Sequence, residues 1–154
     1  MNGSQQSNRP GILGTIAVAV IALAACANAA FADEIKVTLS GAQEVPAVTT
    51  SASGGGTIMI NADKSVAGSV KTTGVAGTMA HIHMAAAGKN GPVIVPLTQG
   101  ADNTWSVPAG AKLTDEQYNA YKAGDLYVNV HSAENKGGEL RGQLNPRVGT
   151  TTGY

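Results

Sequence analysis

The chain has 154 residues, in which ten lysines and arginines balance ten aspartates and glutamates. Arg9 is the one charged residue before position 33, and the later charges form no runs. The sequence therefore argues against nucleic-acid binding, which needs a basic stripe, and against electrostatic attachment to a membrane surface. Aromatic residues make up 4% of the chain, which leaves little material for a platform on which bases or sugars could stack.

The first part of the chain has the features of an export signal. An apolar run rich in alanine, valine and isoleucine covers residues 12–25. A polar stretch with Arg9 precedes it and small residues follow it, which is the order of a secretory signal peptide. The run is shorter than the roughly 20 apolar residues of a spanning helix. We therefore expect residues 1–32 to be a signal peptide and the protein to be periplasmic or extracellular.

Two processing sites compete at the end of this signal. Residues 30–32 fit the small-x-small rule for cleavage before Asp33. Residues 23–26 resemble a lipobox, in which Cys26 would become the lipidated first residue of a membrane-anchored lipoprotein. Cleavage before Asp33 is favoured, because processing at Cys26 would leave almost no tether before the domain. Cys26 is the only cysteine, so no disulfide is expected, and membrane contact is expected only through a lipid anchor there.

The rest of the chain is built from short segments of alternating apolar and polar residues. Ile35, Val37 and Leu39 alternate with polar residues, which is the period of a half-buried strand. Residues 51–56, rich in serine and glycine, are interpreted as a linker. The same alternation predicts further strands, at residues 57–61, 65–72, 79–84, 93–97, 104–107, 126–131 and 139–144. Strands at this spacing predict an all-β domain, an antiparallel β-sandwich of the immunoglobulin-like or Greek-key type.

One short helix is predicted near residues 114–123. Thr114 is a favourable N-cap residue, and Gln117 three positions later completes a capping box. Gly124 is suited to end the helix in a left-handed conformation. We expect this helix to cover one end of the β domain.

Several motifs are similar to those of the CHRD (chordin) domain family. In the order typical of that family they are LSGAQEVP at 39–46, AHIH at 80–83, the helix entry at 113–114, LYVNVH at 126–131 and GGELRGQL at 137–144. The resemblance covers residues 33–145, which we take as one domain, and residues 146–154 are predicted to be a flexible tail. It implies an antiparallel β-sandwich. Members accompany growth-factor-binding modules in animal chordin and also occur in microbial exported proteins.

The three histidines of the chain are its main chemical lead. His81 and His83 lie two residues apart in a predicted strand, so their side chains project from one face. His131 ends another predicted strand, and the three imidazoles converge if these strands are neighbours. Three histidines with an open position suit copper or zinc, and a thioether from Met79 or Met84 would favour copper(I).

The same histidines also allow a structural interpretation. His81 and His83 could bond loop carbonyls and close one end of the domain, while His131 could pair with Glu139. A third interpretation is a metal-dependent oxidoreductase, because the pattern is similar to part of the copper site of Cu/Zn superoxide dismutases. The chain has too few histidines for such a binuclear site, so this is the weakest alternative.

The charged and aromatic residues outside this group are given structural roles. Glu139 and Arg141 are interpreted as a salt bridge on a solvated strand face. Glu44 is interpreted as a loop residue that orders backbone amides, and Trp105 as part of the core. The sequence contains no Gly-x-Ser-x-Gly motif and no phosphate loop, so we expect no enzyme.

Two functions therefore remain open. The first is a non-enzymatic binding or structural module that acts on an unknown protein partner or by self-association. The second is a periplasmic or extracellular protein that binds copper or zinc through His81, His83 and His131.

Overall fold

The computed structural model describes residues 33–146 together with residues 1 and 3. The predicted signal peptide, Cys26 and nearly all of the predicted tail lie outside these residues. Within the described part of the chain, no helix is long and apolar enough to cross a membrane.

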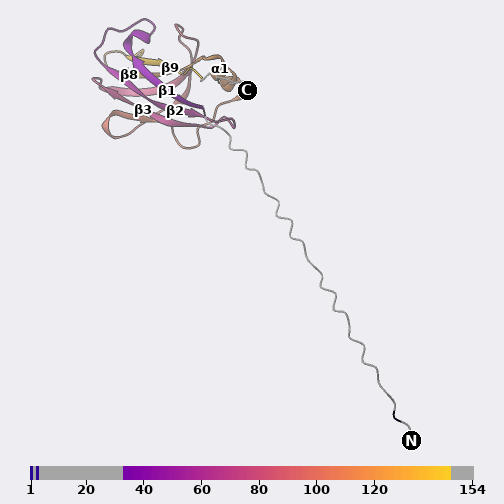
Figure 1. The fold of residues 1–154 in the computed structure, drawn as a ribbon. Helices are drawn as coiled ribbons and strands as arrows, with labels where there is room; N and C mark the ends of the chain where they lie inside the picture. The colour runs from indigo at the N-terminus through magenta and orange to yellow at the C-terminus, as the bar shows by residue number, and fades with distance from the viewer. Residues whose placement is uncertain (2, 4–32, 147–154) are drawn as a thin grey trace, which may run out of the picture.

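The predicted all-β antiparallel fold with one short helix is confirmed. The strands are β1 (Asp33–Ser40), β2 (Ser53–Ile60), β3 (Val66–Thr73), β4 (Gly77–Met84), β5 (Val93–Pro96), β6 (Thr98–Gln99), β7 (Thr104–Ser106), β8 (Leu126–Ser132) and β9 (Leu140–Gln143). The helix α1 (Asp115–Ala123) lies at one end of the strands (Figure 1), and two 3-10 turns cover Gly41–Gln43 and Ala101–Asn103.

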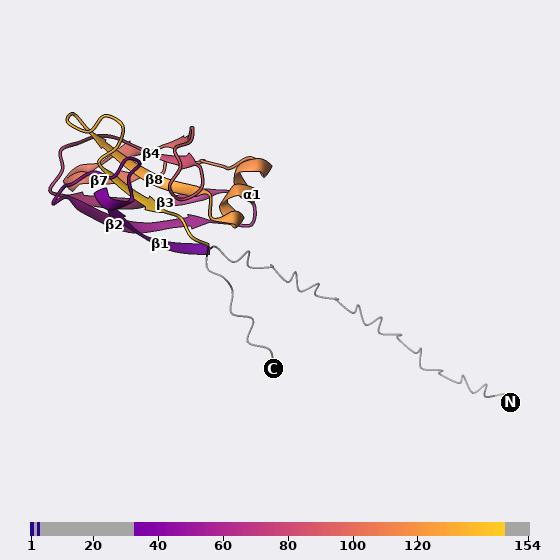
Figure 2. The same ribbon diagram turned by 90° about the horizontal axis from the view of Figure 1, so that it is seen from above.

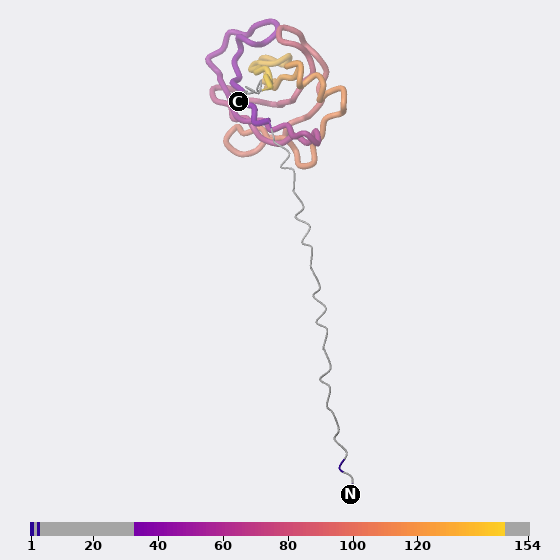
Figure 3. Tube along the Cα trace, turned by 45° about the vertical axis from the view of Figure 1, so that its right-hand side comes forward, coloured from indigo at the N-terminus to yellow at the C-terminus, as the bar shows by residue number. Residues whose placement is uncertain are grey.

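All strands of the described residues belong to one nine-stranded sheet, in the order β5-β4-β8-β9-β1-β2-β3-β7-β6. Its two edge strands, β5 and β6, are separated in the chain by the single residue Leu97. The Leu97 backbone N–H donates to the Ala80 carbonyl of β4 at 2.9 Å, which brings the two edges together. The sheet is thus nearly closed, and the trace encircles the core (Figure 3). The layers that face each other in Figure 2 are parts of this continuous sheet.

The inward residues of the sheet form one hydrophobic core. Ile35, Val37 and Leu39 are all buried, as their alternation with exposed neighbours predicts. Trp105 of β7 is also buried, which confirms its expected place in the core. From α1, Tyr121 enters the same cluster and its hydroxyl donates to the carboxylate of Asp33 at 2.7 Å.

The interpretation of residues 51–56 as a linker is wrong. Most of this stretch belongs to β2, which pairs with β1 on one side and β3 on the other. A Cβ atom at Gly56 would collide with the Ser69 carbonyl oxygen and would lie 2.7 Å from the Cα atom of Val70. Glycine stands in this strand because the neighbouring backbone approaches too closely for a side chain.

The helix begins and ends where its sequence signals predict. The Thr114 side chain accepts from the Gln117 backbone N–H, and the Gln117 side chain accepts from the Thr114 backbone N–H. Gly124 ends the helix in the left-handed region, with φ of 82°. These reciprocal bonds satisfy backbone donors that a helix N-terminus otherwise leaves without partners.

Candidate metal centre

The residues of chemical interest lie on the outer face of β4, β8 and β9. In the register of β4 and β8, Met79 is opposite His131 and His81 is opposite Asn129. Asn129 is in turn opposite Arg141 of β9. Hydrogen bonds hold the loops after β4 and β8 against this face. His131, Asn129 and Arg141 are therefore buried, although they belong to a polar cluster outside the hydrophobic core.

The structure brings the three histidines together, because β4 and β8 are neighbours. One ligand nitrogen from each of His81, His83 and His131 can be chosen so that all three lie within 4.8 Å of one another. Nδ1 of His81 is 3.1 Å from Nε2 of His131. His83 and His131 are buried, while His81 is half-buried and faces the open side of the group.

Backbone carbonyls fix two of these rings. Nδ1 of His83 is 2.9 Å from the Gly91 carbonyl oxygen, and Nδ1 of His131 is 2.9 Å from that of Lys136. A carbonyl can only accept, so both Nδ1 atoms carry the proton and both Nε2 atoms present a lone pair. Bonds to loop carbonyls fit the structural interpretation, and they are also the usual support of metal-binding histidines. His131 does not pair with Glu139, which was one alternative of the structural interpretation, because its two nitrogens contact the Lys136 carbonyl and His81 instead.

One of the two Nε2 atoms is buried without a hydrogen-bond partner. Nε2 of His83 has no hydrogen-bond partner among the described residues. Buried polar atoms nearly always have a partner, and each exception needs a physical reason. A metal ion between the imidazoles would supply the missing interaction.

The electrostatics of the group favour neutral imidazoles. Burial lowers the pKa of His81, and the neighbouring His131 and His83 lower it further. Burial also lowers the pKa of His83 and outweighs the opposing effect of the Gly91 carbonyl. Neutral imidazole is the form that binds metal.

The spacing of the nitrogens is close to that of a metal site. Two nitrogens bound to one ion at about 2.0–2.1 Å lie about 3.3 Å apart in tetrahedral geometry. Nδ1 of His81 and Nε2 of His131 share a hydrogen bond at 3.1 Å, and an ion that replaced this bond would find the two nitrogens at nearly the required separation. The three ligand nitrogens lie up to 4.8 Å apart, so the imidazole rings would need to move closer together to bind one ion.

The two methionines named as candidate ligands have different positions. Met79 is on the face of His81 and directly opposite His131, and its side chain is exposed. Met84 packs against the hydrophobic core, on the other face of β4. The prediction that Met84 could join the histidines is therefore not supported by its position, because successive side chains of a strand alternate between faces.

The His83 ring is held in place by a stack of two further side chains, Tyr127 and Arg141. The His83 ring lies parallel to that of Tyr127, with centroids 4.9 Å apart and an angle of 11°. The guanidinium of Arg141 covers the other side of Tyr127 at 3.5 Å from its centroid. Arg141 also donates to the Ala86 carbonyl and to Oδ1 of Asn90, each at 3.3 Å. It thereby holds the loop that carries the carbonyl partner of His83.

The interpretation of Glu139 and Arg141 as a solvated salt bridge is wrong. Arg141 is 1% exposed and is occupied by the stack and the loop after β4. Glu139 is also buried, and it accepts from the Thr50 hydroxyl at 2.8 Å and from Asn135 at 3.3 Å. Strand alternation places both residues on one face, but the loops that cover this face supply separate partners to each.

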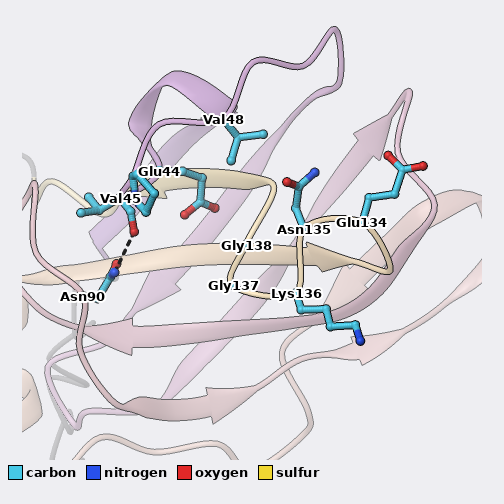
Figure 4. A pocket seen from close by; sticks show the side chains of 10 residues that line it. Glu44, Val45, Val48, Asn90, Glu134, Asn135, Lys136, Gly137 and Gly138 are labelled. Atoms are coloured by element: carbon cyan, nitrogen blue, oxygen red, sulfur yellow. Dashed lines mark hydrogen bonds between the residues drawn. The ribbon is translucent and has the colours of Figure 1, made fainter.

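Glu44 belongs to the same buried polar cluster. Its carboxylate accepts a short hydrogen bond from Nδ2 of Asn129 and lies against Gly138, where a Cβ would meet the Glu44 Oε1 atom at 2.6 Å. Burial raises the pKa of Glu44 to about 7, although Arg141 opposes this shift. A cavity of about 480 Å³ opens beside this carboxyl, between residues 44–48 and 134–138 (Figure 4). The interpretation of Glu44 as a loop residue did not include its place in this buried cluster. Its position within the LSGAQEVP motif was the available signal.

Together these observations define a small all-β domain with a buried, histidine-centred polar cluster on the outside of its sheet. The family model of the CHRD domain matches residues 35–144, well over half of the chain, and the chain therefore belongs to the CHRD domain family. Comparisons with curated proteins and with solved structures gave no match. The motifs that carry the family resemblance supply the polar cluster, including Glu44, the three histidines and Arg141.

Proposed function

We propose that this protein is an exported, non-enzymatic binding module whose ligand is a single copper or zinc ion held by His81, His83 and His131. The observation that carries the proposal is the buried Nε2 of His83, which has a lone pair but no partner among the described residues. One nitrogen from each of the three histidines can be chosen so that all three lie within 4.8 Å of one another. Imidazole is a common ligand for both metals, and three histidines leave an open coordination position.

A purely structural role accounts for less of this geometry. A histidine that only ties down a loop needs one bonded nitrogen, and His83 achieves this through Gly91. Such a role gives no reason to bury the second nitrogen without a partner beside two other imidazoles, because that burial costs about 1–3 kcal/mol. Metal binding would offset this cost.

The export part of the proposal has separate support. The signal-like segment before residue 33 is followed directly by the CHRD domain, which has no further cysteine to keep reduced. Extracytoplasmic compartments expose proteins to copper and zinc ions, to which a preformed nitrogen site would bind without needing a reducing environment.

The experiment is a zinc and copper(II) titration of the protein purified after expression of the full chain. We expect sub-micromolar binding of one ion, and His83→Ala should weaken it by at least about 100-fold, because it removes a buried ligand. Lys89→Ala is the matched control, since Lys89 is an exposed residue of the same covering loop. Its affinity should equal that of the wild type.

Circular dichroism of each variant would establish that the fold is retained. The metal proposal is overturned if the wild type binds no ion, or if folded His83→Ala binds as tightly as the wild type.

A further inference from the structure

The histidine group has an exposed thioether beside it. Apart from Met1, the large hydrophobic side chains exposed in the described part of the chain are Met79, at 49%, and Val93, at 48%. Both lie next to the histidines, since Met79 is opposite His131 and Val93 is opposite His83. Methionine is usually buried, so an exposed thioether at this place needs an explanation.

The strand register puts Met79 within reach of the group. Side chains of directly opposite residues on one face have Cβ atoms about 4.5–5.5 Å apart. Nε2 of His131 turns toward His81, which is two residues along the same face from Met79. Met79 is therefore the neighbour, on this face, of both imidazoles that would share the ion. The three rotatable bonds of methionine let its sulfur turn toward such an ion.

The charge around the group makes a singly charged ion the better match, although neutral imidazoles bind zinc as well. The cluster of metal-binding side chains found there consists of three histidines and includes no carboxylate. Glu44 and Glu139 are bonded instead to Asn129 and to Thr50. The positive charge of Arg141 also acts on His83, with the ring of Tyr127 between them. Neutral ligands next to a fixed positive charge suit a singly charged ion better than a divalent one.

Building on the metal site proposed above, we propose that Met79 is its fourth ligand and makes the site selective for copper(I). Thioether sulfur is a soft donor that selects copper(I), whereas imidazoles alone serve zinc equally well. The proposed ligand set has three imidazole nitrogens and one thioether sulfur, and it contains no carboxylate. This donor set matches the charge and the softness of copper(I).

The test compares copper(I) and zinc affinities of the wild type, Met79→Leu and Val93→Ala under anaerobic conditions, with a competing chromophoric chelator. Met79→Leu keeps the size and exposure of the side chain but removes the sulfur. It should weaken copper(I) binding about tenfold while zinc binding changes less than about twofold. Val93→Ala removes the other exposed apolar side chain of this face and should change neither affinity.

X-ray absorption of the copper(I)-loaded protein gives a second measurement. The wild type should show a sulfur neighbour of the copper ion that is lost in Met79→Leu. The assignment of Met79 is overturned if no sulfur neighbour is found, or if the substitution weakens copper(I) and zinc binding equally or not at all. His83→Ala separates the two proposals, because it should weaken binding of both metals by at least about 100-fold even if Met79 is not a ligand.

Discussion

At the scale of single residues, burial has changed the acidity of Glu44. Its side chain is 6% exposed, and its hydrogen bond comes from the neutral amide of Asn129. A carboxylate in such a place loses more hydration than one amide can replace, which raises its pKa to about 7 from an ordinary value of 4.5. The folded protein therefore binds this proton more tightly than the unfolded chain does.

The sign of the resulting pH dependence follows from linkage. The buried, ionised carboxylate of Glu44 lowers the free energy of unfolding most above pH 7. This destabilisation disappears as the pH falls from about 7 toward 4.5, because the folded protein then binds a proton at Glu44. Near pH 8 we expect Glu44→Gln to increase the free energy of unfolding by no more than about 3 kcal/mol relative to the wild type. The thermal midpoint should rise accordingly. Near pH 5 the gain should shrink or vanish.

Thermal unfolding of both proteins at these two pH values measures the effect. Glu34→Gln, at an exposed carboxyl of β1, is the control and should give a small difference that is similar at both pH values. A gain of Glu44→Gln that is as large at pH 5 as at pH 8 would contradict the assigned pKa direction.

At the scale of the elements, β2 shows that the close approach of neighbouring strands can determine the residue type in a strand. Its glycines pair with backbone on both sides, and Gly56 and Gly55 have no room for a Cβ next to the carbonyls of Ser69 and Val37. The local composition resembles a linker because both linkers and crowded strands favour glycine. Only the position of the neighbouring strands distinguishes the two cases.

This crowding predicts a large effect of a single methyl group. Gly56→Ala should destabilise the protein by about 2–3 kcal/mol, because the strands must separate to admit the Cβ. Gly137→Ala places the same methyl group where no atom lies within 4 Å, and it should change stability by less than about 1 kcal/mol. Urea unfolding of both variants measures the difference, and equal stabilities would refute the role assigned to Gly56.

At the scale of the whole molecule, closure of the sheet joins its two edges into one unit. Trp105 of β7 packs against β4, where a Cβ at Gly77 would lie 2.6 Å from the indole ring. The side chain of Gln99 in β6 donates to the Gly77 carbonyl at 3.5 Å. These contacts cross from one end of the strand order to the other, so Trp105 reports on closure.

One continuous sheet around one core should unfold in a single step. Trp105 is the only tryptophan, and its fluorescence should therefore change together with far-UV circular dichroism across a denaturant titration. A shift of the emission to longer wavelength at lower denaturant concentration would show that the edges open before the sheet unfolds, and that closure is not part of the cooperative unit.

The sequence by itself determined the features that depend on local periods. Alternation located most of the strands but missed β6 and the glycine-rich start of β2. A Thr–Gln pair located the start of α1, and the His-x-His spacing placed His81 and His83 on one face. These predictions succeed because strand pleat and helix capping involve residues only two or three positions apart.

Only the tertiary structure decided which strands are neighbours and what covers them. It brought His131 to His81, packed Met84 against the core, and buried Arg141 beneath loops from distant parts of the chain. Strand pairing and loop coverage depend on contacts between residues tens of positions apart, which a local pattern does not encode. The histidines could therefore be named from the sequence, whereas their common site and its support became visible only in the folded sheet.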